Sequence, residues 1–221
     1  MFDKGRDQMS KITRLVKGKN RKKRVNVYLD GRFSFSVLPE VVVKKALKIG
    51  QELAESEIEE LLGTDRYQRC YNAAVRYLGY RPRSEAEVRQ RLQRHGFDGE
   101  CTERTLGKLK EQGLVDDSAF ARFWIENRES FSPRSRRLTR MELQRKGLDR
   151  GIIDQTVAEV DDNDSAYRAA VSKASRLDST DFTTFRRRLG DHLRRRGFGY
   201  EVINDITQRL WREQSSNPVK G

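Results

Sequence analysis

The residues of this sequence with the clearest chemical role are arginines and lysines, which occur in short runs and can bind anionic groups. A guanidinium group is planar, permanently charged and able to pair with a phosphate or a carboxylate through two parallel hydrogen bonds. Successive cationic side chains along a chain are typical of polyanion binding. The residues predicted to contact phosphate or another anionic surface are Lys22, Lys23, Arg24, Arg134, Arg136, Arg137, Arg186, Arg187, Arg188, Arg194, Arg195 and Arg196.

A plainer interpretation stays open for each run, namely a solvated helix face stabilised by ion pairs one turn apart. It is weakest for residues 186–196, because Asp191 is the sole acid there. Aromatic side chains lie between the basic runs and could stack on nucleic-acid bases. Their helical spacing favours a core position instead. The aromatic residues concerned are Tyr67, Tyr71, Tyr77, Tyr80, Phe120, Phe123, Trp124, Phe131 and Trp211.

The overall composition supports an acidic partner. The formal net charge is +13 over 221 residues, which favours nucleic acid, an anionic membrane or a protein that carries either. Hydrophobic residues make up 35% and charged residues 36%, a balance that suits thin helical layers better than one large core. The valines at 41–43 form the longest aliphatic run, too short to span a membrane, and no apolar signal core is present.

No catalytic constellation is recognisable. The sequence lacks the phosphate-binding, dinucleotide-binding, nucleophile-elbow and metalloprotease motifs. Its two histidines and two cysteines do not readily build a metal or nucleophile site, and Cys70 and Cys101 without a CxxC motif fit a reduced cytosol. Asp116 and Asp117 are better explained as a helix N-cap than as metal ligands. We therefore predict a cytoplasmic protein that is not an enzyme and has no cofactor.

The first 62 residues predict a small unit of strands and helices. Alternating apolar residues indicate strands within 11–37, and Asp30-Gly31 between two of them is a hairpin signal. Pro39 is expected to open a short helix that Gly50 closes. Residues 52–62 then predict a second, acidic helix.

The remainder predicts helices throughout. Ser84 and Glu87 form a capping box, and Ser132-Pro133 is expected to start another helix as N-cap and first helical residue. Asp117 and Asp164 are expected to head the helices that contain "SAFARFWIENR" and "SAYRAAVSKA".

A helix–glycine turn–helix pattern recurs three times. Gly96, Gly147 and Gly197 are 51 and 50 residues apart, each preceded by a leucine four positions earlier and followed by a candidate N-cap two positions later. This predicts a mainly α-helical protein of tandem three-helix repeats in an elongated array, preceded by a small β-hairpin-containing N-terminal unit. The predicted divisions are 1–10, 11–63, 64–113 (repeat 1), 114–161 (repeat 2), 162–214 (repeat 3) and 215–221.

The stretch "LRRRGF" at 193–198 accordingly has two parts. Leu193, Gly197 and Phe198 belong to the repeated helix terminator, whereas Arg194, Arg195 and Arg196 are candidates for function. The equivalent positions of the other repeats are Gln-Arg-His and Gln-Arg-Lys, so the third copy is the most purely basic. The last repeat is therefore the preferred candidate for an electrostatic contact.

From about Lys11 to Trp211 the sequence resembles the RecX family of bacterial recombination regulators. The segments "RPRSEAEVRQRL" and "GLVDDSAFAR" carry the resemblance most specifically, and the third repeat diverges in detail but keeps its Gly-Phe turn. Members of this family are built from tandem three-helix repeats, in agreement with the periodicity above.

The resemblance implies a function that composition does not give. Family members bind RecA and RecA–DNA filaments and modulate them, usually by inhibiting recombinase, ATPase and co-protease activities. The implied partners are RecA and its nucleoprotein filament, and direct contact with single- or double-stranded DNA is left open. We expect no membrane partner and a monomeric protein. The alternative is a stand-alone basic DNA-binding protein with helix-turn-helix-like repeats.

Overall fold

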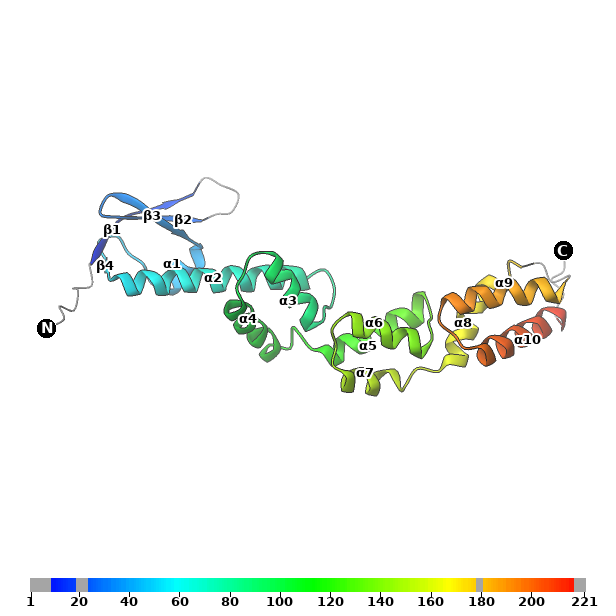
Figure 1. The fold of residues 1–221 in the computed structure, drawn as a ribbon. Coiled ribbons are helices and arrows are strands. Elements are labelled where there is room, and N and C mark those ends of the chain that lie inside the picture. Colours follow the sequence, from blue (N-terminus) through cyan, green and yellow to red (C-terminus); the bar gives the residue numbers. More distant parts are fainter. Residues whose placement is uncertain (1–8, 19–23, 178–180, 217–221) are drawn as a thin grey trace. The chain divides into compact units, whose positions relative to one another are not determined.

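Four strands and ten helices make up the described part of the chain, residues 9–18, 24–177 and 181–216 of a computed structural model (Figure 1). They form two compact units. Unit 1 comprises Met1–Arg81 and Val88–Gln112, and unit 2 comprises Pro82–Glu87 and Gly113–Gly221. The predicted class, mainly helical with a small N-terminal sheet and tandem three-helix repeats, is confirmed, while the elongated arrangement stays a prediction.

The strands of unit 1 form one antiparallel sheet in the order β3-β2-β1-β4. Their bounds are Ser10–Lys17 for β1, Val25–Leu29 for β2, Arg32–Val37 for β3 and Glu52–Leu53 for β4. The hairpin predicted between β2 and β3 is confirmed, because Asp30 and Gly31 both take positive φ (49° and 82°), as a type I′ turn requires. Inward-facing residues such as Ile12, Val27 and Val37 are fully buried.

Helix α1 (Pro39–Lys44) starts at the predicted proline but is shorter than predicted. It was expected to continue to Gly50, yet Ala46 already takes a positive φ of 49°, which ends helical geometry. Gly50 instead occupies a turn at φ 91°, and its N–H donates to the Ile12 carbonyl at 2.7 Å. Gly50 therefore turns the chain into β4, so residues 52 and 53 are a strand and not the start of a helix.

Helix α2 (Glu55–Leu78) joins the N-terminal unit to the first repeat without a break. The predicted division after residue 63 falls inside it, and we keep the sequence-based divisions as a proposal. Asp65 of α2 is 3% exposed and accepts the Leu38 N–H at 2.7 Å and a guanidinium hydrogen of Arg24 at 2.9 Å. This carboxylate ties α2 to the sheet.

Gly63 is a weak point of α2, because glycine in a helix interior costs about 1 kcal/mol relative to alanine. A Cβ atom added there would meet no atom within 4 Å. We therefore expect Gly63→Ala to raise the free energy of unfolding by about 0.8–1 kcal/mol, measured by urea titration followed by circular dichroism. A loss of stability would show instead that α2 requires a deformable position here.

The three repeats each contain three helices. Repeat 1 uses the second half of α2 with α3 (Glu85–Arg94) and α4 (Gly99–Glu111). Repeat 2 consists of α5 (Asp117–Phe131), α6 (Arg136–Arg145) and α7 (Arg150–Val157). Repeat 3 consists of α8 (Asp162–Ala174), α9 (Phe182–Arg195) and α10 (Tyr200–Ser216).

The middle helix of every repeat ends in the predicted glycine turn. Gly96, Gly147 and Gly197 have φ values of 80°, 78° and 89°. In each turn the residue after the glycine donates its N–H to the carbonyl of the repeated leucine, at 3.3–3.4 Å, which completes a Schellman cap. The residue after the glycine is buried in repeats 2 and 3, where it joins the core beside that leucine.

Several predicted helix starts are displaced. Ser132 caps the C-terminus of α5 rather than the N-terminus of the next helix, which begins after Ser135. Asp116 and Asp161 are the N-caps of α5 and α8, each accepting two backbone N–H groups, so Asp117 and Asp164 lie inside the first turn. The Ser84–Glu87 capping box is confirmed by both of its hydrogen bonds, at 3.2 and 3.4 Å.

Some of the aromatic residues that were predicted to lie in the core do so, and two do not. Phe120 is buried, and the Trp211 ring lies 5.2 Å from the rings of both Phe182 and Phe185. Tyr80 and Phe131 are 79% and 82% exposed, so the prediction of a core position is wrong for these two. Among the described residues we find no helix with both the length and the apolar composition needed to pass through a bilayer.

Candidate functional site

Consecutive repeats meet through a recurring contact, which we call the repeat joint. The N-terminal turn of one repeat's middle helix lies against the glycine turn of the following repeat. In the first joint Ser84 Oγ donates to the Lys146 carbonyl at 2.7 Å, and in the second the Ser135 N–H donates to the Arg196 carbonyl at 3.0 Å. Both joints lie inside unit 2, to which residues 82–87 belong. A helix N-terminus thereby satisfies a carbonyl at the end of the next middle helix.

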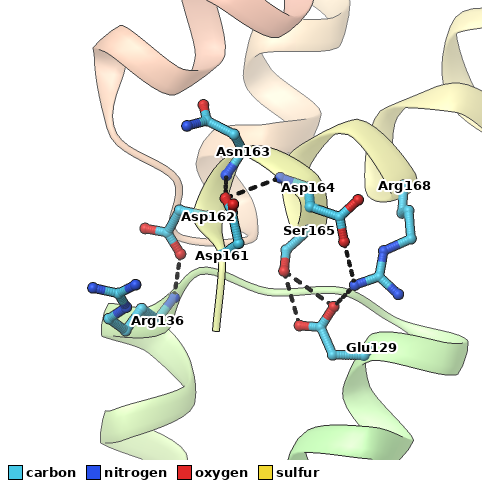
Figure 2. A network of polar contacts seen from close by, with 8 residues as sticks. All are labelled: Glu129, Arg136, Asp161, Asp162, Asn163, Asp164, Ser165 and Arg168. Carbon is cyan, nitrogen blue, oxygen red and sulfur yellow. Dashed lines mark hydrogen bonds and ion pairs between the residues drawn. The ribbon is translucent and has the colours of Figure 1, made fainter. Parts of the chain in front are cut away.

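An aspartate completes each joint. Asp117 Oδ1 accepts the Glu85 N–H at 2.8 Å, and Asp162 Oδ1 accepts the Arg136 N–H at 2.6 Å (Figure 2). In both cases the preceding aspartate caps its own helix. The N-cap interpretation of Asp116 is therefore confirmed, and the second carboxylate of each doublet caps the middle helix of the previous repeat. The sequence signal that could have predicted these aspartate contacts is the recurrence of Asp-Asp or Asp-Asp-Asn at the start of repeats 2 and 3.

A second group of polar contacts holds repeat 3 to repeat 2. Glu129 of α5 accepts hydrogen bonds from Ser165 Oγ at 2.9 and 3.0 Å and from Arg168, which also pairs with Asp164 at 2.9 Å (Figure 2). Within repeat 2 the Arg136 side chain donates to the Val160 carbonyl, just before α8, at 2.6 and 3.0 Å. Helix α8 is bonded to α5 through Ser165 and Arg168, and to α6 through Asp162.

Glycine is required where the repeats touch. A Cβ atom on Gly147 would lie 2.4 Å from the Ala86 Cβ, and one on Gly197 would lie 2.5 Å from Ser135 Oγ. Gly96 has the same positive φ, but a Cβ added there would meet nothing within 4 Å. In repeats 2 and 3 glycine is thus needed for two reasons: the turn has a positive φ, and the previous repeat lies too close to leave room for a Cβ atom.

The structure divides the predicted basic residues into two classes. Four described arginines make contacts within the protein. Arg24 bonds Asp65 and Ser36, Arg134 pairs with Glu142, and Arg136 donates to the Val160 carbonyl. Arg196 is half-buried in the second joint, and burial, followed by the charges of Arg134 and Arg195, lowers its pKa.

The remaining described arginines of the prediction are exposed, although Arg186 donates to the Tyr200 hydroxyl and Arg194 pairs with Asp191. Five of them lie on α9 or at its end and one on α6; they are Arg137, Arg186, Arg187, Arg188, Arg194 and Arg195. Lys22 and Lys23 lie outside the described residues. A role of any of these residues in binding stays a prediction, and the exposed arginines of α9 are the set most open to an outside partner.

A buried glutamate in repeat 2 was not anticipated from the sequence. Glu142 of α6 is 9% exposed and accepts hydrogen bonds from Trp124 Nε1 and Arg128 Nε, each at 2.8 Å, and from Arg134 Nη1. Arg128 also lies over the Trp124 ring, 4.8 Å from its centroid. Only the packing of α5 against α6 reveals that these arginines face inward.

The surroundings of the two cysteines and of His192 shift their pKa values in the direction that favours the neutral forms. Burial raises the pKa of the Cys70 thiol, and burial together with Cys70 raises that of Cys101 to about 12. Burial, assisted by the charge of Arg196, lowers the pKa of His192, whose Nε2 lies 3.1 Å from the Ala169 carbonyl. Protonated thiols are poor nucleophiles, and these shifts disfavour the thiolate form of both cysteines.

Three domain models of one family match the chain in order. The model described as "Regulatory protein RecX N-terminal domain" matches residues 10–54. Those described as "RecX, first three-helix domain" and "RecX, second three-helix domain" match residues 70–109 and 116–157. These ranges correspond to the sheet with α1, to repeat 1 and to repeat 2.

Full-length relatives extend the similarity into repeat 3. A "Regulatory protein RecX" from Bacillus pumilus (strain SAFR-032) is 30% identical over 206 residues, which cover 92% of this chain and 78% of the relative. One from Clostridium botulinum (strain Alaska E43 / Type E3) is 27% identical over 205 residues, covering 90% and 96%. The solved "Crystal structure of regulatory protein RecX" matches with a TM-score of 0.66 at 25% identity, over 90% of this chain and 99% of that one.

Proposed function

Because the chain belongs to the RecX family of regulatory proteins, we propose that it binds RecA and RecA–DNA filaments and modulates their activities in the inhibitory direction. The activities concerned are recombination, ATP hydrolysis and co-protease function. The observation that supports this is the row of exposed arginines on α9, which the repeat joints leave open to solvent. A polyanion, or an acidic surface of a protein bound to one, is the complementary partner.

The mode of action that we propose is binding without catalysis. A chain of tandem three-helix repeats suits a partner that itself repeats. We further propose that the protein acts in the cytoplasm as a monomer and needs no cofactor. The protonated thiols and the engaged carboxylates described above are consistent with a role in recognition.

RecA-dependent ATP hydrolysis on single-stranded DNA tests this proposal. We expect sub-stoichiometric protein to lower the ATPase rate and strand exchange of RecA from the same organism. Replacing Arg186, Arg187 and Arg188 of α9 by glutamine should weaken the effect, since these arginines are exposed. The matched control replaces the exposed Lys44, Lys48 and Arg76 of unit 1 by glutamine, with the same change of net charge.

The outcomes separate the function from its site. Unchanged ATPase and strand exchange with the wild-type protein would refute the proposed function. An equal loss of effect in the α9 variant and the control would leave RecA regulation standing and remove α9 as the contact. Arg196 is left intact in both variants, because its side chain is half-buried and its replacement would also test packing.

The exposed arginines also favour the second candidate function, a stand-alone DNA-binding protein with helix-turn-helix-like repeats. That function predicts binding to duplex DNA without RecA and a steep loss of affinity with salt, set by the number of phosphates neutralised. If the protein binds RecA filaments and duplex DNA is a poor competitor for that binding, the result would argue against this second function.

A further inference from the structure

Repeat 3 contains a hollow of about 430 Å³ between α9 and the start of α10. Three arginines line it, Arg186, Arg187 and Arg194, together with Tyr200 at the first turn of α10. Its volume falls within the range of sites for small ligands, about 300–1,000 Å³. It is therefore large enough for a nucleotide-sized group and too small for a helix of nucleic acid.

Gly190, in the middle of α9, and Ile203 of α10 are part of the lining. A Cβ atom on Gly190 would lie 3.5 Å from Ile203 Cγ2, an ordinary contact distance, so the two helices pack closely at this point of the hollow. Arg187 and Arg194 stand three residues before and four residues after Gly190, which places both on the same face of the helix. The opening is therefore flanked by a guanidinium group on each side.

The charges around the hollow favour an anion. Three guanidinium groups share the lining with one carboxylate, that of Asp191. Arg194 Nη1 pairs with Asp191 Oδ1 at 3.1 Å, yet the Arg194 side chain stays 73% exposed. Asp191 thus orients Arg194 and leaves the lining with an excess of positive charge. Phosphate groups satisfy such a set of donors best, because guanidinium forms bidentate bonds to them.

Tyr200 supplies a flat surface beside these charges. It is 73% exposed, although tyrosine usually buries much of its ring, and Arg186 Nη2 donates to its hydroxyl at 3.1 Å. This hydrogen bond holds the ring at the edge of the hollow before any ligand arrives. An exposed aromatic ring next to arginines is the arrangement with which proteins bind unpaired bases.

We propose that this hollow binds single-stranded nucleic acid, with phosphates on Arg187 and Arg194 and a base stacked on Tyr200. A duplex fits less well, since its bases are stacked on each other and cannot cover the tyrosine ring. An acidic peptide would use the arginines but has no use for an open aromatic face. The contact needs no RecA, so it goes beyond the proposed function and can fail independently of it.

The arginines are tested by two variants of equal charge in the same helix. Fluorescence anisotropy with a labelled oligothymidylate, in the absence of RecA, compares Arg187→Gln/Arg194→Gln with Arg188→Gln/Arg195→Gln, whose residues lie outside the hollow. The first variant should bind roughly tenfold or more weakly, and the slope of log affinity against log salt should fall by about 1.4 for two lost phosphate contacts. All four side chains are exposed, so both variants should fold. Equal losses in the two variants would overturn the site.

The tyrosine is tested with a strand that has phosphates but no bases. Tyr200→Leu should weaken binding of oligothymidylate by roughly five- to a hundredfold and leave an abasic strand of the same length unaffected. Tyr200→Phe keeps the ring and should bind nearly as well as the wild type. The proposal fails if Tyr200→Leu changes both strands alike. It also fails if polyglutamate competes as well as unlabelled oligothymidylate, because the hollow would then serve an acidic protein.

Discussion

Gly147→Ala should destabilise unit 2 by about 2–5 kcal/mol. A positive φ costs an L-residue about 1–2 kcal/mol, and Gly147 has a φ of 78°. The added Cβ would lie 2.4 Å from the Ala86 Cβ, and overpacking of this kind costs about 1–3 kcal/mol more. Urea unfolding followed by tryptophan fluorescence measures the loss, since Trp124 and Trp211 both lie in unit 2 and the Lys146 ammonium lies 4.8 Å from the Trp124 ring centroid.

Gly96→Ala is the matched control for the close contact. Gly96 occupies the same turn at φ 80°, but a Cβ there meets no neighbour, so its loss should be limited to about 1–2 kcal/mol. Circular dichroism measures both variants by the same signal. Equal losses at the two glycines would show that the turn alone requires glycine.

A double-mutant cycle with Ala86→Gly isolates the contact itself. Removing the Ala86 Cβ deletes the atom that Gly147→Ala would strike. We expect Ala86→Gly to cost about 1 kcal/mol alone, because glycine is a poor helix residue. Combined with Gly147→Ala it should restore about 1–3 kcal/mol relative to additivity. Strict additivity would contradict a direct contact between repeats 1 and 2 at this joint.

Glu142→Ala should destabilise repeat 2 by about 3–5 kcal/mol. The substitution removes one buried partner of Arg128 and Arg134 and leaves both cations half-buried without their carboxylate. The Trp124 indole N–H loses its acceptor as well. Thermal unfolding followed by tryptophan emission, to which Trp211 also contributes, measures the loss.

Two further variants decide whether the buried ion pairs of Glu142 account for the loss of stability. Glu142→Gln keeps the shape and an acceptor oxygen and should cost about half as much, since the charge alone is lost. Asp154→Ala removes two exposed ion pairs of the same repeat, with Arg140 and Arg150, and should cost below about 1 kcal/mol. A Glu142→Ala loss as small as that of Asp154→Ala would mean that solvent replaces the carboxylate without penalty.

The sequence by itself determined the local conformations. The Asp30-Gly31 hairpin, the Ser84–Glu87 capping box and the three glycine turns all followed from backbone preferences within a few residues. Repetition of the glycine at nearly equal intervals was enough to predict tandem three-helix repeats, whereas the resemblance to the family rested on the segments "RPRSEAEVRQRL" and "GLVDDSAFAR".

Where two local signals competed, only packing could choose between them. Ser132 and Ser135 are both acceptable N-caps, and Ser132 is followed by proline. Helix α5 continues to Phe131, while the Ser135 N–H bonds the Arg196 carbonyl of the next repeat. A partner about 60 residues away thus fixes the start of α6, and no local preference contains that information.

The tertiary structure alone decided which basic residues face solvent. Arg134 and Arg137 look alike in sequence, yet Arg134 pairs with the buried Glu142 whereas Arg137 is exposed. Likewise, Arg196 enters the second joint while Arg194 lines the hollow of repeat 3. A charge run gives the number of cations within a segment, but the direction of each side chain depends on the acids and carbonyls that sequence-distant helices bring beside it.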